Sequence, residues 1–208
     1  MKTPYLLAAL GATALLAACS SRDPSKRHFT QAIDAHFQKH CLEVNPTTHD
    51  FNDADSYPAT FTLNGDDTDG GAWMVASYEA LVKAGMLAVQ DGVTQGIWGE
   101  RPNKTYSLTA AGRVALKGQG KYDTNRFCAG HLETTEIVMF TTPAVSNGMT
   151  VSQVTFTAKA VDVPAWAMRK DLGDAMPEAV RWRDPVGKRQ LILVLTNEGW
   201  LVDGDQTL

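Results

Sequence analysis

The chain has 208 residues, of which 44% are hydrophobic, 20% charged and 8% aromatic. This composition is typical of a globular protein with one or two small domains. It excludes a wholly disordered chain, a collagen-like repeat and a polytopic membrane protein. The formal charge is −4. A mild acidic excess gives no reason to expect nucleic acid as a partner, because phosphate binding needs a local cluster of basic residues.

The first twenty residues have the layout of a secretory signal. Lys2 supplies one positive charge, and a largely apolar run follows from Leu6 to Ala18. About thirteen apolar residues are too few to cross a hydrocarbon core of roughly 30 Å as a helix, but they match the core of a signal peptide. The sequence therefore predicts a signal peptide over residues 1–18.

The end of this apolar run, Leu16-Ala17-Ala18-Cys19, resembles the lipobox of bacterial lipoproteins. The resemblance implies cleavage after Ala18 and a thioether-linked diacylglycerol on Cys19, with an additional N-acyl chain in Gram-negative bacteria. It also implies sorting to the outer membrane, which Ser20 favours over retention in the inner membrane. Two or three acyl chains anchor a protein stably, whereas one chain binds weakly. The alternative is an ordinary signal peptide, with Cys19 a free thiol.

Two further cysteines, Cys41 and Cys128, remain for the folded part of the chain. Export takes them to an oxidising compartment, where a disulfide between them is the default expectation. Such a bond would close a long loop and stabilise the fold by roughly 4–5 kcal/mol from chain entropy. The alternative is a pair of buried thiols. A redox role is not expected, since the sequence has no Cys-x-x-Cys motif.

The mature chain is expected to begin with a short polar tether over residues 19–27. A helix should start near Ser25, because Phe29, Ile33 and Phe37 recur every four residues and form one apolar ridge. A second helix is predicted near residues 72–84, where small and apolar residues cover most positions. Two short strands joined by a long glycine-rich excursion should follow it.

Two segments carry a second resemblance. Residues 81–87 and 106–112 resemble, respectively, the helix end that enters the wing and the wing end that enters the next helix in bacterial winged-helix repressors of the MarR and PadR type. The resemblance implies a helical, winged-helix-like lobe over residues 28–120. We do not expect DNA binding, because Lys83 is the only basic residue on the outward face of the equivalent helix. A reader of the major groove needs several basic or amide side chains there.

The second half of the chain is rich in strand-forming residues. Four strands are expected, at residues 132–141, 151–161, 189–196 and 200–202. A short helix should open at Asp162 and run to about Leu172. The predicted fold is therefore α+β, with a winged-helix-like helical lobe followed by a small antiparallel β-sheet lobe over residues 126–208 that contains one helical insertion.

One pair of histidines has metal-ligand spacing. His36 and His40 lie four positions apart on the first predicted helix, which lets two imidazoles share a zinc ion. Only His28 and His49 suggest themselves as a third ligand, and boundary residues of an amphipathic helix explain the spacing without a metal. We therefore expect neither a metal nor a cofactor.

Other candidate sites also have two interpretations. The acidic segment 64–70 could bind calcium, but it lacks the EF-hand spacing, and a solvated turn that caps the next helix is the better interpretation. His131 and Glu133 could form an acid/base or ligand pair on one strand face, or pair structurally with neighbours. Three tryptophans could line a groove for a sugar or peptide, or belong to the core: Trp166, Trp182 and Trp200.

The familiar motifs of hydrolases, zinc proteases and phosphate-binding loops are absent from the sequence, so we expect no enzymatic activity. The sequence indicates an outer-membrane lipoprotein that is anchored through Cys19 and faces the periplasm. We expect it to act by contact with an envelope protein or as an accessory structural component. The alternatives are a lipoprotein that binds a glycan, a peptide or a cation and, less favoured, a cell-wall hydrolase.

Overall fold

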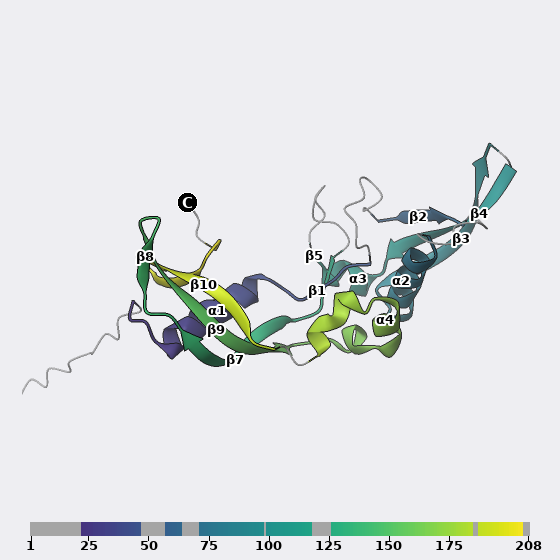
Figure 1. The fold of residues 1–208 in the computed structure, drawn as a ribbon. Coiled ribbons are helices and arrows are strands. Elements are labelled where there is room, and N and C mark those ends of the chain that lie inside the picture. Colours follow the sequence, from purple (N-terminus) through teal and green to yellow (C-terminus); the bar gives the residue numbers. More distant parts are fainter. Residues whose placement is uncertain are drawn as a thin grey trace, which may run out of the picture.

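The computed structural model describes residues 22–46, 57–63, 71–97, 99–117, 126–184 and 187–205. The predicted signal peptide, the lipobox with Cys19, the acidic segment 64–70 and His49 lie outside these ranges. The described elements form an elongated body, with a curled sheet at one end and a long hairpin at the other (Figure 1). Within the described ranges, no helix combines the length and apolar character needed to cross a membrane.

The curled sheet at one end has five antiparallel strands. They are β7 (His131–Phe140), β8 (Ala144–Ser146), β9 (Met149–Val161), β10 (Arg189–Thr196) and β11 (Gly199–Val202). Their order is β11-β10-β9-β7, and β8 pairs with the start of β9. Helix α1 (Lys26–Lys39) lies along one face of this sheet (Figure 1).

Helix α1 confirms the helix predicted from the apolar ridge. The hydroxyl of Ser25 accepts a hydrogen bond from the backbone N–H of His28 and caps the helix. Phe29 and Ile33 are fully buried against the sheet. The ring of Phe29 meets Phe140 and Trp200 edge-on, with ring centroids 4.8 and 5.0 Å apart. The helix and the sheet thus share one apolar core, which we call the sheet core.

A second core lies toward the other end of the molecule. Helix α2 (Gly71–Lys83) packs on the three-stranded sheet of β2 (Ala59–Thr62), β4 (Gly99–Leu108) and β3 (Leu87–Gly96), and α3 (Ala110–Ala115) follows β4. Helices η1 (Ala165–Met168), α4 (Lys170–Ala175) and η2 (Glu178–Arg183) join the same core. Tyr78, Leu81 and Tyr106 are fully buried there. We call it the hairpin core.

The two cores are linked by chain segments that run side by side. Strand β6 (Arg126–Cys128) pairs with β1 (Glu43–Val44) on one edge and with β5 (Leu116–Lys117) on the other. Cys41 and Cys128 form a disulfide between two of the linking segments, with their Cα atoms 5.5 Å apart. The predicted disulfide is therefore confirmed, and Leu42 beside it contacts both cores.

The predicted fold class, a helical lobe followed by a sheet lobe, is wrong in the order of the lobes and in the proportion of helix to strand. Strands predominate, and a helical lobe does not come first, because α1 packs on the sheet formed by the second half of the chain. Conversely, the helices after β9 pack in the hairpin core rather than beside their own sheet. The physical reason is that the apolar side of α1 and the apolar face of the curled sheet fit each other. The ridge of α1 covers a curled sheet face that would otherwise expose Val154 and Phe156 to water.

Three local expectations are also corrected. The glycine-rich excursion after β3 is instead a continuous ladder, because β3 and β4 stay paired from Leu87 and Leu108 as far as Gly96 and Gly99. The C-terminal sheet has a fifth strand, since β8 folds back on β9 through a turn at Asn147 and Gly148, both with positive φ. The single predicted insertion helix is a run of three short helical segments.

Candidate functional site

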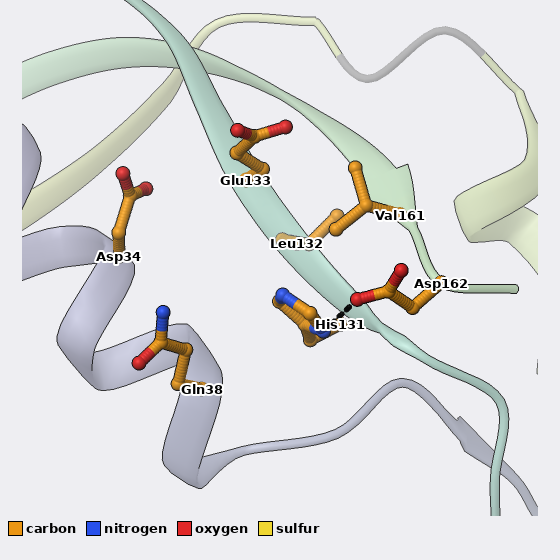
Figure 2. A pocket seen from close by; sticks show the side chains of 7 residues that line it. All are labelled: Asp34, Gln38, His131, Leu132, Glu133, Val161 and Asp162. Carbon is orange, nitrogen blue, oxygen red and sulfur yellow. Dashed lines mark ion pairs between the residues drawn. The ribbon is translucent and has the colours of Figure 1, made fainter.

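Polar side chains gather in a shallow pocket between α1 and one end of the sheet (Figure 2). It has a volume of about 350 Å³. Helix α1 contributes Asp34 and Gln38, and the ends of β7 and β9 contribute the rest: His131, Leu132, Glu133, Val161 and Asp162. Both predicted members of the acid/base pair therefore lie at one pocket.

The two members of the predicted acid/base pair, His131 and Glu133, have partners other than each other. His131 Nδ1 lies 3.7 Å from Asp162 Oδ2, while Glu133 Oε2 lies 3.2 Å from Lys159 Nζ across the sheet. Asp34 accepts a hydrogen bond of 2.8 Å from the backbone N–H of Thr134. These contacts tie α1 and β9 to β7. The arrangement is one of structural pairing at the rim of a solvated pocket.

A second polar cluster lies at the same, C-terminal end of α1 but on the opposite side of the helix. His36 Nδ1 is 3.0 Å from Asp205 Oδ2, and His40 Nε2 is 3.4 Å from Asp205 Oδ1. The imidazole rings of the two histidines lie 4.4 Å apart. The spacing on α1 thus brings the two rings together as predicted, but their partner is Asp205. His28 instead donates from Nδ1 to the backbone carbonyl of Asp23, at 2.8 Å.

The turn after β11 positions Asp205. Its backbone N–H donates to the carbonyl of Val202 at 3.0 Å, and its side chain is only 11% exposed. Burial alone would raise the pKa of this carboxyl group. The hydrogen bonds from His36 and His40, together with the charges of His36 and Lys39, outweigh that effect, so the pKa lies below its usual value. Asp205 is therefore held as a carboxylate.

The three candidate tryptophans do not form one groove. Trp182 is buried in the hairpin core, where its Nε1–H donates to the carbonyl of Ala179. Trp166 packs against Phe127 in the same core, with ring centroids 6.3 Å apart. Trp200 belongs to the sheet core instead. The interpretation of these residues as core residues is the one that the packing supports.

Trp200 also fixes the beginning of the described chain. Its Nε1–H donates to the backbone carbonyl of Arg22, at 3.0 Å. Arg22 falls inside the predicted tether, and α1 already begins at Lys26. The described part of the tether is therefore held against the sheet core. Sequence reasoning missed this contact because the two residues lie 178 positions apart.

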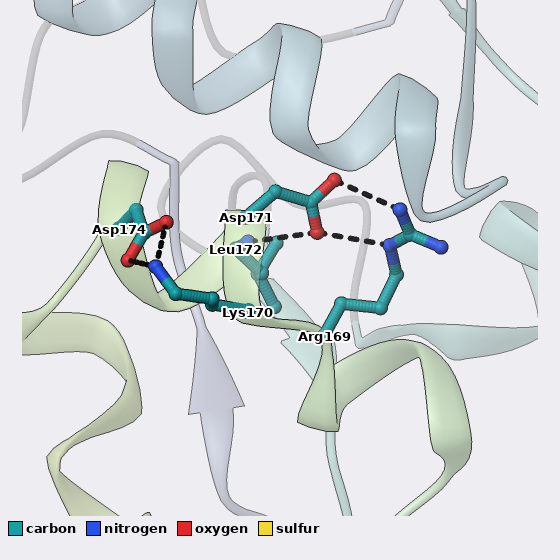
Figure 3. A network of polar contacts seen from close by, with 5 residues as sticks. All are labelled: Arg169, Lys170, Asp171, Leu172 and Asp174. Carbon is teal, nitrogen blue, oxygen red and sulfur yellow. Dashed lines mark hydrogen bonds and ion pairs between the residues drawn. The ribbon is translucent and has the colours of Figure 1, made fainter.

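Four charged residues around the start of α4 form a local network (Figure 3). Arg169 donates two hydrogen bonds of 2.9 Å to the carboxylate of Asp171, which also accepts the backbone N–H of Leu172. The guanidinium holds the pKa of Asp171 below its usual value. Lys170 pairs with Asp174 one turn further on. These contacts fix the first turn of α4, and the carboxylates of Asp171 and Asp174 are each paired with a basic side chain.

The end of the β3–β4 hairpin presents apolar side chains to solvent. The last residue pair between β2 and β4 is Thr62–Asn103. Residues 93–96 and 99–102 then form a two-stranded ribbon, which the described part of the segment after β2 meets through the hydrogen bond from the Leu63 N–H to the Pro102 carbonyl. Beyond this point Val93 is 64% exposed and Ile97 is 94% exposed. We call residues 93–97 and 99–102 the hairpin tip.

A buried tyrosine supports the base of this hairpin. The hydroxyl of Tyr106 donates to Glu79 Oε1 at 3.0 Å, and Lys104 Nζ lies 3.1 Å from the same oxygen. Burial, followed by the carboxylate of Glu79, raises the pKa of Tyr106 well above its usual value. The hairpin is thus fastened to α2 at its base, while the tip extends into solvent.

Comparison of the chain with protein families, with curated proteins and with solved structures gives no match. The function must therefore be inferred from the residues and their geometry.

Proposed function

We propose that this protein is a lipid-anchored component of the bacterial outer membrane, with its folded body in the periplasm, that acts by contact with another envelope protein. The anchor is the acylated Cys19, as its resemblance to the lipobox implies. The contact is made by the hairpin tip. The observation that carries this proposal is that Arg22, the first described residue, is hydrogen-bonded to Trp200 of the sheet core, and that this sheet and the hairpin tip are at opposite ends of an elongated body (Figure 1).

The proposed anchor at Cys19 is only a short stretch of chain away from a residue that is held at the sheet core. Cys19 is only three positions before Arg22, whose carbonyl is hydrogen-bonded to Trp200. Three extended residues reach about 10 Å. A diacylglycerol on Cys19 would therefore hold the end formed by α1 and the five-stranded sheet next to the membrane surface, and the hairpin tip would point away from it.

The hairpin tip has the properties of a contact element. Its four residue pairs, from Val93–Pro102 to Gly96–Gly99, extend about 13 Å beyond the three-stranded sheet. A two-stranded ribbon without a sheet partner is only marginally stable in water. Covering Val93 and Ile97 would remove apolar surface from water and stabilise the ribbon at the same time. A partner protein supplies that cover.

The contact is tested by photo-crosslinking in intact cells. A photoreactive amino acid at Ile97 should give one discrete adduct with an envelope protein. The matched control is Val114 on α3, which is 89% exposed and apolar but lies outside the hairpin tip. An equal adduct at both positions, or none at Ile97, contradicts a contact at the tip.

The anchor is tested separately, by mass spectrometry of the native amino terminus and by fractionation. We expect a diacylglyceryl group on Cys19 and recovery with outer-membrane lipid, and we expect Cys19→Ala to abolish both. An unmodified terminus, or a protein that washes freely from membranes, refutes the anchored state without bearing on the contact at the tip.

A further inference from the structure

His36, His40 and Asp205 form a cluster whose residue types and spacing suit a metal ion. Its three ligand atoms come from the last turn of α1, from the residue that ends it, and from the turn after β11. All three lie within 4.8 Å of one another. Four residues on a helix are about one turn, so the two imidazoles face the same way by construction.

The spacing of the ligand atoms is close to that of a tetrahedral zinc site. Zinc bonds to nitrogen and oxygen are about 2.0–2.1 Å long, which puts neighbouring ligand atoms about 3.3 Å apart. Asp205 Oδ2 lies 3.0 Å from His36 Nδ1, and the second oxygen, Oδ1, lies 3.4 Å from His40 Nε2. The two histidine nitrogens need to close by at most about 1.5 Å, which is within the reach of side-chain rotation.

We propose that His36 Nδ1, His40 Nε2 and the Asp205 carboxylate bind one divalent transition-metal ion, with Zn²⁺ as the preferred ion. Two imidazoles and one carboxylate favour zinc over the hard cations Mg²⁺ and Ca²⁺, which prefer oxygen ligands. The side chain of His40 is 55% exposed, so a water molecule can complete the coordination from solvent.

The bound ion would fasten the end of α1 to the turn that follows the last strand of the sheet. Without the ion, Asp205 is linked by hydrogen bonds to His36 and His40, an arrangement that we call the clasp. Two features limit the affinity: the site has three protein ligands rather than four, and Lys39 adds a positive charge nearby. The site lies where α1 meets the turn after β11, and it does not depend on the contact proposed for the hairpin tip.

Zinc binding is measured on the purified protein without a histidine tag, by isothermal titration calorimetry and by thermal denaturation. We expect one Zn²⁺ per chain and, at a hundredfold excess over the dissociation constant, a rise in Tm of about 5–10 °C. Co²⁺ should show the visible absorption of a four-coordinate site. Mg²⁺ and Ca²⁺ should produce neither effect.

Two variants test the assignment of the ligands. His40→Gln retains a donor toward Asp205, and Asp205→Asn retains the shape of the side chain, so both preserve the clasp in part. Each should weaken zinc binding at least about tenfold. His131→Gln is the matched control, because His131 also pairs with an aspartate but belongs to the other pocket. It should leave zinc binding unchanged.

Absence of zinc binding by the unaltered protein overturns the proposal. So does zinc binding that is equally strong in His40→Gln and in Asp205→Asn, because the ion then binds elsewhere. His40 lies at the exposed end of α1, so an unchanged circular dichroism spectrum is expected and shows that the variant is folded. A variant that lowers Tm but leaves zinc affinity unaltered identifies the cluster as a clasp alone.

Discussion

Removal of the disulfide between Cys41 and Cys128 should destabilise the protein strongly. The bond joins residues 87 positions apart in the sequence and lies where the chain passes from one core to the other. Backbone hydrogen bonds beside it, from Leu42 to Gly130 at 2.8 Å and from Ala129 to Leu42 at 2.7 Å, hold the same two segments. They keep the segments paired in the native state after the sulfur bridge is lost, so the main effect acts on the unfolded chain.

The size of this effect follows from loop closure. For a loop of this length, the chain-entropy relation gives about 4.6 kcal/mol at 25 °C. In a protein of 150–250 residues, each kcal/mol lowers Tm by roughly 2–4 °C. The double variant Cys41→Ser/Cys128→Ser should therefore melt about 9–18 °C below the oxidised protein. This range is an upper value, because residual structure in the unfolded state reduces the entropic gain.

The measurement is thermal denaturation followed by circular dichroism, with and without reductant. The oxidised protein should have the highest Tm, and reductant should lower it to near that of the double variant. The double variant itself should not respond to reductant. If the oxidised protein and the double variant melt within about 2 °C of each other, the bond does not constrain the unfolded chain and the reasoning fails.

Two further perturbations test the packing. Gly130 has φ +98, and a Cβ there would lie only 2.4 Å from the carbonyl oxygen of Val161. Gly130→Ala should therefore lower the free energy of unfolding, measured in urea, by more than Gly148→Ala does. Gly148 also has a positive φ, but a Cβ there would meet open space. Equal losses of stability would argue against the close approach at Gly130. Tyr106 keeps its proton when folded, so its stabilising effect is present below the unfolded pKa of about 10 and is lost as the pH rises above it. Tyr106→Phe should flatten the alkaline loss of stability, and parallel curves for the two proteins would contradict this.

The sequence alone predicts the features that depend on residues close together along the chain. The apolar ridge of Phe29 and Ile33 predicts α1 and its start near Ser25 correctly, because helical periodicity is a local property. The pairing of Cys41 with Cys128 followed from there being two cysteines in the folded part of a chain that is predicted to be exported. The signal peptide and the anchor at Cys19 also follow from local pattern, and they remain predictions.

Only the tertiary structure decided which elements meet. An apolar helix face such as that of α1 fits any apolar surface of suitable shape, so its periodicity could not show that it packs on a sheet formed more than one hundred positions later. For the same reason no spacing pointed to Asp205 as the partner of His36, or to Arg22 as the partner of Trp200. Two apolar surfaces stabilise the fold when their shapes fit each other. That fit exists only in the folded protein and leaves no periodic pattern in the sequence.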